Sequence, residues 1–282
     1  DGTAVTTGYT YNSRNQLVTE ETDGEETSYA YDANGNLLEK AGPAASEEYT
    51  YDVDNRLSTY VAGHGDKQET YAYDAEGVRR SKTSQDGKQE TSTVFLSDTS
   101  GELSRTLAET DGDGTLLAAY TWGDTLVSQT RAGKTSGYLY DGHGNVRGLL
   151  DGEGNLTDAY SYNAYGELTR RTGGTENHYL YTGEYYDGVS GLYYLRARYM
   201  NPETGTFLSM DTYGGDMYEP VTLHKYLYAN GNPVKYTDPS GMFSLPECNI
   251  SLAVTSVVQN QTSLLYLGIL AGTGNAALTA AC

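Results

Sequence analysis

Residues 29–37 read YAYDANGNL, and this nine-residue pattern recurs along most of the chain. The first four copies begin 20, 20 and 22 residues apart, and a fixed period of this length is typical of repeat proteins whose units pack on their neighbours. The other copies are YTYNSRNQL (9–17), YTYDVDNRL (49–57), YAYDAEGVR (71–79), YLYDGHGNV (138–146), YSYNAYGEL (160–168) and two degenerate ones that begin at Val94 and Tyr120.

Each copy has the pattern of a β-hairpin. Tyr-x-Tyr alternates with a period of two, which places both rings on one face of a strand. The Asp or Asn that follows favours a tight turn, because such residues tolerate a left-handed backbone and bond to nearby N–H groups. Since no helix-period pattern of useful length precedes residue 243, the sequence predicts an all-β fold of successive hairpins. We expect each returning strand to begin at the leucine of its copy, namely Leu17, Leu37, Leu57 and Leu168.

The composition supports this fold and excludes some functions. The 282 residues include 28 tyrosines but only 3 phenylalanines, together with 34 glycines, which indicates half-buried strands and many turns. A net charge of −20 argues against nucleic acid and anionic lipid as partners, because both attract basic surfaces. High solubility is a sufficient explanation for the same charge.

Metal, cofactor and conventional catalytic motifs are not found in the sequence. The acidic stretch DGDG (111–114) lacks the closing Glu of an EF-hand loop, so turn formation explains it better than calcium binding. Cys248 and Cys282 are not in a zinc-binding spacing and are either free or paired. The four histidines are scattered, and no nucleophile elbow or phosphate-binding loop occurs. No cofactor and no metabolic enzyme activity are expected.

Two further stretches make a family resemblance specific. They are GEYYDGVSGLYYLRARYMNPETGTFLSMD (183–211) and KYLYANGNPVKYTDPSGM (225–242). With the repeats, they resemble the Rhs/YD-repeat family, which includes Rhs proteins, the C-type subunits of Tc toxins, wall-associated bacterial proteins and teneurins. The resemblance implies a β-sheet that winds into a hollow shell, a core region that plugs one end, and a variable segment held inside as cargo.

The resemblance also implies three regions. Residues 1–178 would form the YD-repeat part of the shell, 179–242 the Rhs repeat-associated core, and 243–282 the start of the variable C-terminal region. The chain holds few hairpins for a closed shell, so we expect an open, curved sheet or one end of a larger container. Because the chain begins with Asp and no signal peptide opens it, we interpret it as a fragment or a processed piece.

Family members often cut their own chain after a second DPxG motif, which here is Asp238–Gly241. The resemblance therefore predicts a scissile bond between Met242 and Phe243. The first motif aligns with DTYG (211–214), so Asp211 would be the partner of Asp238, with Asp216 as a further candidate. Two carboxylates held close together share one proton, so one can activate water while the other protonates the leaving nitrogen.

Two positions near the first motif depart from the family pattern. Met210 stands where an arginine is common, and Thr212 replaces the proline. An arginine at the first position would hold the carboxylates and stabilise developing negative charge. Arg196 or Arg198 in LYYLRARY could take its place, but the family resemblance assigns these two arginines to the core fold instead. The alternative for Asp238 is a purely structural role at the start of a Pro-Ser-Gly turn.

The sequence changes character after Met242, because residues 243–282 carry one charged side chain, Glu247. Their apolar run LLYLGILAG is short for a membrane span. These residues are interpreted as a truncated cargo domain or a remnant, or alternatively as a short helix packed on the sheet.

Three functions follow from these observations. The first is the shell of a polymorphic toxin or secreted surface protein, bacterial in origin, that encloses its own C-terminal cargo and releases it by aspartic-type self-cleavage. The second is a cell-surface adhesion module that binds glycans or proteins without cleavage. The third is a structural surface repeat. An export apparatus or a cell-surface receptor would be a partner, and the protein would be secreted or held at the cell surface.

Overall fold

The computed structural model describes residues 6–43, 45–242 and 244–246. Its largest element is one antiparallel sheet of sixteen strands, in which each strand pairs with the strands before and after it in the chain. Strands β1 and β16 end the sheet and do not pair with each other, so the sheet is open, as expected. The strands are β1 (Thr7–Tyr11), β2 (Leu17–Thr22), β3 (Glu25–Tyr31), β4 (Leu37–Ala41), β5 (Ser46–Tyr51), β6 (Leu57–Ala62), β7 (Lys67–Tyr73), β8 (Arg79–Asp86), β9 (Gln89–Asp98), β10 (Arg105–Thr110), β11 (Leu116–Trp122), β12 (Leu126–Arg131), β13 (Lys134–Tyr140), β14 (Val146–Leu150), β15 (Leu156–Tyr162) and β16 (Leu168–Thr172).

The remaining described residues form short elements. The only helices among the described residues are 3-10 turns, which agrees with the prediction of an all-β fold. In this part of the chain no helix is long and apolar enough to span a membrane. The elements are η1 (Gly63–Gly65), η2 (Tyr181–Gly183), β17 (Tyr185–Asp187), β18 (Leu192–Leu195), β19 (Arg198–Asn201), β20 (Thr206–Phe207), η3 (Pro220–Leu223), η4 (Tyr228–Gly231), β21 (Tyr236–Thr237) and β22 (Leu245–Pro246).

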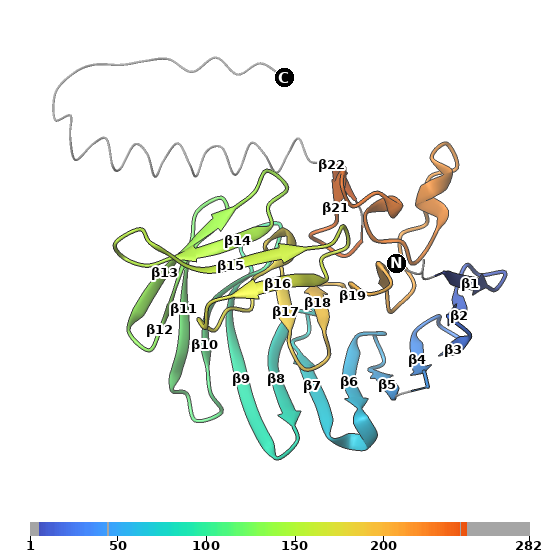
Figure 1. The fold of residues 1–282 in the computed structure, drawn as a ribbon, viewed down its shortest axis with the longest axis horizontal. Helices are drawn as coiled ribbons and strands as arrows, with labels where there is room; N and C mark the ends of the chain where they lie inside the picture. The colour runs from blue at the N-terminus through green and yellow to red at the C-terminus, as the bar shows by residue number, and fades with distance from the viewer. Residues whose placement is uncertain (1–5, 44, 243, 247–282) are drawn as a thin grey trace, which may run out of the picture.

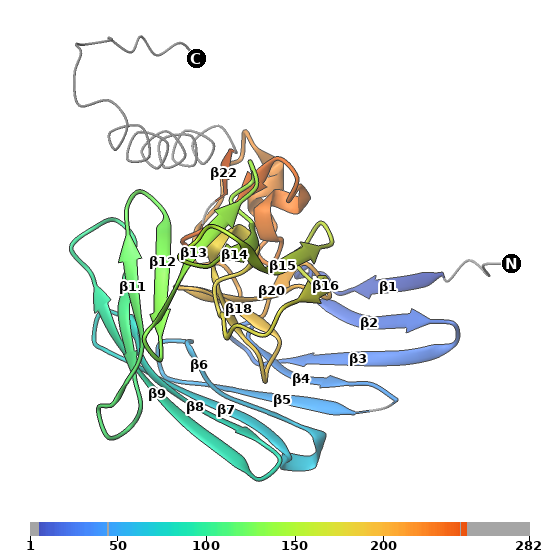
Figure 2. The ribbon, with the colours of Figure 1, turned by 60° about the vertical axis from the view of Figure 1, so that its left-hand side comes forward.

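The large sheet is strongly curved, and the chain after β16 returns to its concave side (Figures 1 and 2). We call residues 179–242 the inner segment. Two hydrophobic clusters join it to the sheet: Tyr29, Tyr49 and Tyr71 pack with Leu192 and Tyr199 in one of them. In the other, tyrosines of β11, β13 and β15 pack with residues of η2 and β17–β19. The inner segment therefore completes the core that the sheet cannot bury alone.

An aspartate or asparagine builds the turn in six of the repeat copies and in two further turns, those at Asp111 and Asp151. In eight turns of the described chain, the carboxylate or amide Oδ1 of this residue accepts the backbone N–H of the residue four positions later, at 2.8–3.1 Å. The residue three positions later has a positive φ, which explains why Gly or Asn stands there, as in Gly35 (88°) and Asn55 (61°). The predicted role of these residues in turns is confirmed, and Asp111 of DGDG is one of them.

The first tyrosine of each repeat faces the inner segment and is buried. Its exposed fraction lies between 2% and 8% in every copy except Tyr9 on the edge strand, where it is 50%. A buried hydroxyl needs a partner; Tyr71 and Tyr120, for example, donate to the carboxylates of Glu69 (2.8 Å) and Glu109 (2.7 Å). The buried first tyrosines are Tyr29, Tyr49, Tyr71, Tyr120, Tyr138 and Tyr160.

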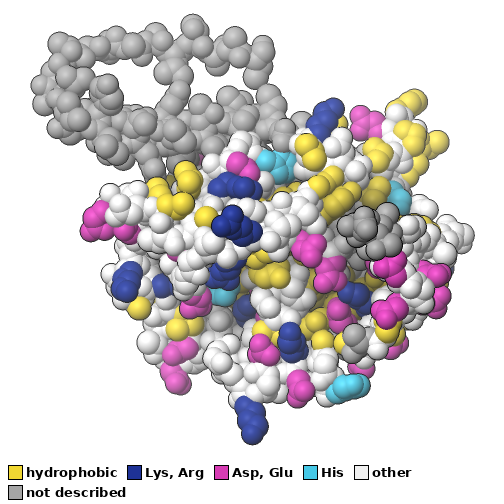
Figure 3. All heavy atoms as spheres, in the orientation of Figure 1, with side chains coloured by type: hydrophobic (Ala, Val, Ile, Leu, Met, Phe, Trp, Pro, Cys, Tyr) yellow, Lys and Arg dark blue, Asp and Glu magenta, His cyan; other side chains and the backbone are white. Residues whose placement is uncertain are grey.

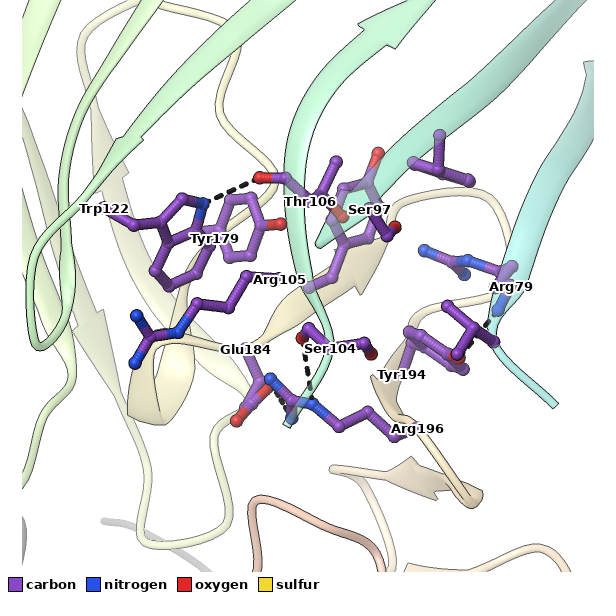
Figure 4. A pocket seen from close by; sticks show the side chains of 13 residues that line it. Arg79, Ser97, Ser104, Arg105, Thr106, Trp122, Tyr179, Glu184, Tyr194 and Arg196 are labelled. Atoms are coloured by element: carbon purple, nitrogen blue, oxygen red, sulfur yellow. Dashed lines mark hydrogen bonds and ion pairs between the residues drawn. The ribbon is translucent and has the colours of Figure 1, made fainter. Parts of the chain in front are cut away.

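The second aromatic residue ties neighbouring repeats together. The hydroxyls of Tyr73, Tyr140 and Tyr162 donate to backbone carbonyls near the start of a strand in the preceding repeat, those of Leu57, Leu126 and Val146, at 2.6–2.7 Å. Trp122 makes the same bond through its indole N–H to the Thr106 carbonyl at 2.7 Å (Figure 4). Phenylalanine cannot donate this bond, so the excess of tyrosine has a direct structural reason.

A buried group of charges joins β17 to β7 and β8. Asp187 is fully buried and forms ion pairs with Arg79 and with Lys82, the latter at 2.8 Å. Lys82 also approaches the buried carboxylate of Glu69 (3.4 Å), and the Arg79 guanidinium lies 4.2 Å from the ring centre of Tyr194. Burial by itself would raise the pKa of Asp187, but the two cations outweigh it and hold the pKa below its ordinary value.

The surface is mixed in charge, with one apolar region. Acidic and basic side chains are interspersed over the face in Figure 3, and hydrophobic side chains gather at the end of the molecule where the segment between β20 and β21 lies. Within that segment Met217 and Tyr218 are 85% and 95% exposed. Exposed apolar groups that lie together are typical of an interaction surface.

We expect Tyr162→Phe to lower the free energy of unfolding by about 1 kcal/mol, because the Val146 carbonyl loses its donor. Tyr218→Phe is the matched control and should change it little, since Tyr218 is almost fully exposed. Urea unfolding of the three proteins measures the difference. Equal effects of the two substitutions would contradict the proposed bond between repeats.

We expect Asp187→Asn to destabilise the fold by about 3–5 kcal/mol, because it leaves Arg79 and Lys82 buried without their counter-charge. The depressed pKa means that this stabilisation is present above about pH 4 and is lost in acid. Urea midpoints at several pH values test both statements. Glu153→Gln, in an exposed turn, is the control, and a loss below about 1 kcal/mol in Asp187→Asn would refute the role of the cluster.

Candidate catalytic site at Asp211 and Asp238

Asp211 and Asp238 lie together, although 26 positions separate them in the sequence. Asp211 follows β20, and its backbone N–H donates to the Lys225 carbonyl at 3.0 Å. Asp238 directly follows β21. An oxygen of each carboxylate approaches the same nitrogen of Arg198, Nη2, at 2.7 Å for Asp211 and 3.6 Å for Asp238.

Arg198 is held from several sides, so its position between the carboxylates is well determined. It belongs to β19, its side chain is 6% exposed, and its guanidinium carbon lies 3.7 Å from the ring centre of Phe207. Its Nη1 donates to the Lys225 carbonyl at 3.1 Å, and its Nε donates to the Gly241 carbonyl. Burial lowers the pKa of Arg198, and the two aspartates oppose this.

The two aspartates differ in their surroundings. The Asp238 side chain is 3% exposed and that of Asp211 is 15% exposed. Burial raises the pKa of Asp238 to about 6, even though Arg198 and the hydrogen bonds of its own turn lower it. Asp211 makes the shorter ion pair with Arg198 and also accepts the N–H of Tyr213 at 2.8 Å. Asp238 is therefore the carboxyl suited to carry a proton, and Asp211 is the one paired more closely with Arg198.

Asp216, the third predicted residue, is engaged in a turn of its own. Its carboxylate accepts the N–H of Tyr218 at 2.8 Å, and its backbone N–H donates to the Thr222 hydroxyl at 2.7 Å. The acidic groups that act on Arg198 are Asp211 and Asp238. The geometry thus provides a pair of carboxylates rather than three.

The Asp-Pro-Ser-Gly turn presents the chain of Met242 to Asp238. The Asp238 Oδ1 accepts the Ser240 hydroxyl and the Met242 N–H, both at 3.1 Å. The predicted scissile bond joins Met242 to Phe243, and Phe243 lies outside the described residues. A cavity of about 370 Å³ reaches both aspartates and Met242, which is ample room for a water molecule.

Arg196 holds the same turn from its other end. Its guanidinium bonds to the Pro239 carbonyl, to the Glu184 carboxylate at 2.8 Å and to the Ser104 carbonyl at 3.4 Å (Figure 4). Glu184 is buried, and burial raises its pKa while Arg196 opposes the rise. Arg196 therefore has a supporting position, and Arg198 is the one that contacts the two aspartates.

Two residues of the site, His224 and Lys225, belong to no sequence motif that would predict their presence there. His224 lines the cavity and accepts the N–H of Tyr226 through Nδ1 at 3.3 Å, and burial lowers its pKa. The Lys225 backbone carbonyl accepts the Asp211 N–H and the Arg198 Nη1, and its Nζ bonds to the Tyr213 carbonyl. Cys248 and Cys282, predicted to be either free or paired, lie outside the described residues. Within the described residues no group of three His, Cys, Asp or Glu side chains could hold a metal ion.

Comparison with known proteins agrees with the repeat pattern. The family profile described as RHS Repeat matches residues 11–47. The chain is 38% identical over 177 residues to the tRNA3(Ser)-specific nuclease WapA of Bacillus spizizenii. The matched region covers 61% of this chain and 7% of that protein. The chain is 37% identical over the same length to the tRNA nuclease WapA of Bacillus subtilis, with the same coverage. The chain thus spans less than a tenth of the length of these relatives.

Solved structures share the fold. The Tc holotoxin pore of Photorhabdus luminescens superimposes with a TM-score of 0.56 at 16% identity, over 85% of this chain and 15% of that one. The TcdB2-TccC3 crystal structure gives a TM-score of 0.55 at 18% identity, over 84% of this chain and 16% of that one. At this identity the likeness concerns the fold alone. The repeats, the open sixteen-stranded sheet and these similarities together identify the chain as a protein with Rhs/YD repeats.

Proposed function

We propose that this chain is the end of an Rhs-type shell, from a toxin or a secreted surface protein, that encloses a C-terminal cargo and releases it by self-cleavage. In this proposal residues 1–178 form shell, 179–242 form the core region that plugs one end, and 243–282 begin the cargo. The observation that carries the cleavage step is the pair formed by Asp211 and Asp238 around Arg198, beside the backbone of Met242.

The reaction is hydrolysis of the Met242–Phe243 peptide bond. Asp211, paired with Arg198, takes a proton from a water molecule in the cavity, and the water oxygen attacks the Met242 carbonyl carbon. Asp238, with its raised pKa, donates its proton to the leaving nitrogen of Phe243 as the C–N bond breaks. The products are a carboxyl group on Met242 and an amine on Phe243. Arg198 compensates the negative charge that gathers between the carboxylates.

Arg198 resolves the absence of an arginine next to Asp211. Met210 occupies that position, and its uncharged side chain, which is 43% exposed, supplies no charge to the site. The guanidinium arrives instead from β19, where its Nη2 lies 2.7 Å from Asp211. The replacement of proline by Thr212 leaves the Asp211 carboxylate in its turn, since it still accepts the Tyr213 N–H.

The cargo, location and partners of the whole protein belong to the same proposal. The relatives named as tRNA nucleases, and the toxin assemblies that share the fold, support a toxic cargo and an extracellular or cell-surface location. An export apparatus or a surface receptor would be the partner of such a shell. The surface with a net charge of −20 disfavours nucleic acid as a partner of the shell itself.

A second function is an adhesion module that binds a glycan or protein without being cut. The exposed apolar residues between β20 and β21, among them Met217 and Tyr218, favour it. Exposed aromatic rings offer a stacking surface to such a ligand. A chain that stays whole would leave this function as the better description.

We expect Asp211→Asn and Asp238→Asn each to slow cleavage by at least about 100-fold, because each removes one proton-transfer group. The chain is synthesised in a cell-free system, and intact mass spectrometry follows the loss of residues 243–282. Asp216→Asn is the matched control and should be cut like the wild type. A wild-type chain that stays whole, or a fast reaction in either pair variant, would show that the pair does not act as proposed.

Cleavage should slow as the pH rises above about 6, by about tenfold per pH unit, because Asp238 must carry a proton to donate it. Freshly synthesised chain is diluted into buffers between pH 6 and 8.5 and sampled over time. His224 also lines the cavity, so His224→Gln serves as the control that should keep the same pH profile. A rate independent of pH over this range would exclude Asp238 as the acid.

A further inference from the structure

Three consecutive backbone carbonyls of the Asp-Pro-Ser-Gly turn are held by three consecutive residues of one hairpin. The hairpin joins β18 to β19. The Arg196 side chain bonds to the Pro239 carbonyl, the Ala197 N–H donates to the Ser240 carbonyl at 3.2 Å, and the Arg198 Nε donates to the Gly241 carbonyl. We call residues 196–198 the carbonyl clamp.

The clamp is itself rigid. Leu195 and Arg198 pair at the base of the hairpin, and Arg196 adopts a left-handed φ of 61° at its tip. Glu184 and the Ser104 carbonyl fix the Arg196 guanidinium, and burial fixes that of Arg198. The turn is equally constrained, because a Cβ at Gly241 would collide with the Leu195 carbonyl oxygen. The backbone carbonyls of residues 239–241 are thus each hydrogen-bonded to the hairpin that carries Arg198.

The next residue is held by its backbone and not by its side chain. The Met242 N–H donates to the Asp238 Oδ1 (3.1 Å) and to the Ser240 Oγ (3.2 Å). The Met242 side chain is 40% exposed, so the described residues form no closed pocket around it. Enzymes that select a residue at the scissile bond enclose its side chain, because discrimination depends on contacts or on groups left unpaired. Such an enclosure is missing at this side chain.

We propose that the carbonyl clamp sets the position of the cut by counting residues from Gly241, whatever the side chain at position 242. The inference rests on the proposed self-cleavage and specifies how its site is selected. The clamp holds the chain as far as Gly241, Asp238 holds the N–H of the residue after it, and the peptide bond that follows that residue is the one hydrolysed. Arg196 acts as a positioning residue, since its guanidinium bonds to the Pro239 carbonyl, the Glu184 carboxylate and the Ser104 carbonyl.

The test separates counting from recognition of the side chain. One alanine is inserted between Gly241 and Met242, and the new termini are identified by mass spectrometry. Counting predicts that the cut moves to the bond after the inserted alanine, so that the released fragment begins with Met242. Met242→Ser, without an insertion, should still be cut after position 242 at a rate within about threefold of the wild type, because the backbone contacts remain.

Three outcomes would overturn the inference while leaving self-cleavage intact. The inserted variant could still be cut between Met242 and Phe243, it could stay whole while its circular dichroism matches that of the cleaved wild type, or Met242→Ser could lose cleavage. A wild-type chain that is never cut would overturn the proposed function as well. The two failures are therefore distinguishable in one set of samples.

The role of Arg196 has its own readout. Arg196→Gln removes the bond to the Pro239 carbonyl but leaves Asp211, Asp238 and Arg198 in place. Counting predicts that cuts then occur at two or more adjacent bonds, whereas a merely structural role would lower the yield without changing the position. Arg147→Gln, whose side chain is 39% exposed, is the matched control and should give a single cut. A single, unmoved cut in Arg196→Gln would exclude Arg196 from positioning.

Discussion

The stability of the sheet depends on hydrogen bonds to the polar groups that it buries, above all the tyrosine hydroxyls. A curved sheet of tyrosines places many hydroxyls where water is excluded, and each unpaired one costs about 1–3 kcal/mol. The repeat meets this need locally: the second aromatic residue donates to a carbonyl of the preceding repeat, as Tyr162 does to Val146. The first tyrosine donates to a nearby carboxylate, as Tyr120 does to Glu109. Stacking the repeats in register therefore satisfies many of the hydroxyls that stacking buries, although the buried hydroxyl of Tyr51 has no hydrogen-bond partner among the described residues.

The inner segment applies the same rule to charges. Asp187 enters the concave face between Arg79 and Lys82, and Arg198 lies between two aspartates. The first arrangement joins the segment to the sheet and has the character of a structural ion cluster. The second leaves a cavity beside the chain and raises the pKa of one carboxyl, which is the pattern of a reactive pair.

One hairpin, between β18 and β19, contacts both the carboxylate pair and the turn that precedes Met242. The strand that supplies Arg198 to the carboxylates is continuous with the clamp that holds the turn before Met242. A shift of this hairpin would move the turn and the charged pair together, so their relative geometry is preserved. This coupling gives a physical reason for the arginines to stand at positions 196 and 198, close to a hairpin tip with a left-handed backbone.

The sequence by itself determined the strands, their turns and their order. Tyr-x-Tyr-Asp predicts a hairpin because the alternation, the capping carboxylate and the glycine or asparagine all act within nine residues, and Leu17, Leu37, Leu57 and Leu168 do begin strands. The motif that ends at Gly241 singled out Asp238, and its counterpart DTYG (211–214) singled out Asp211. Only the tertiary structure decided that Arg198, rather than a neighbour of Asp211, lies between them, because ion pairs between distant segments follow from packing. The same holds for Asp187, whose partners lie more than a hundred positions earlier in the chain.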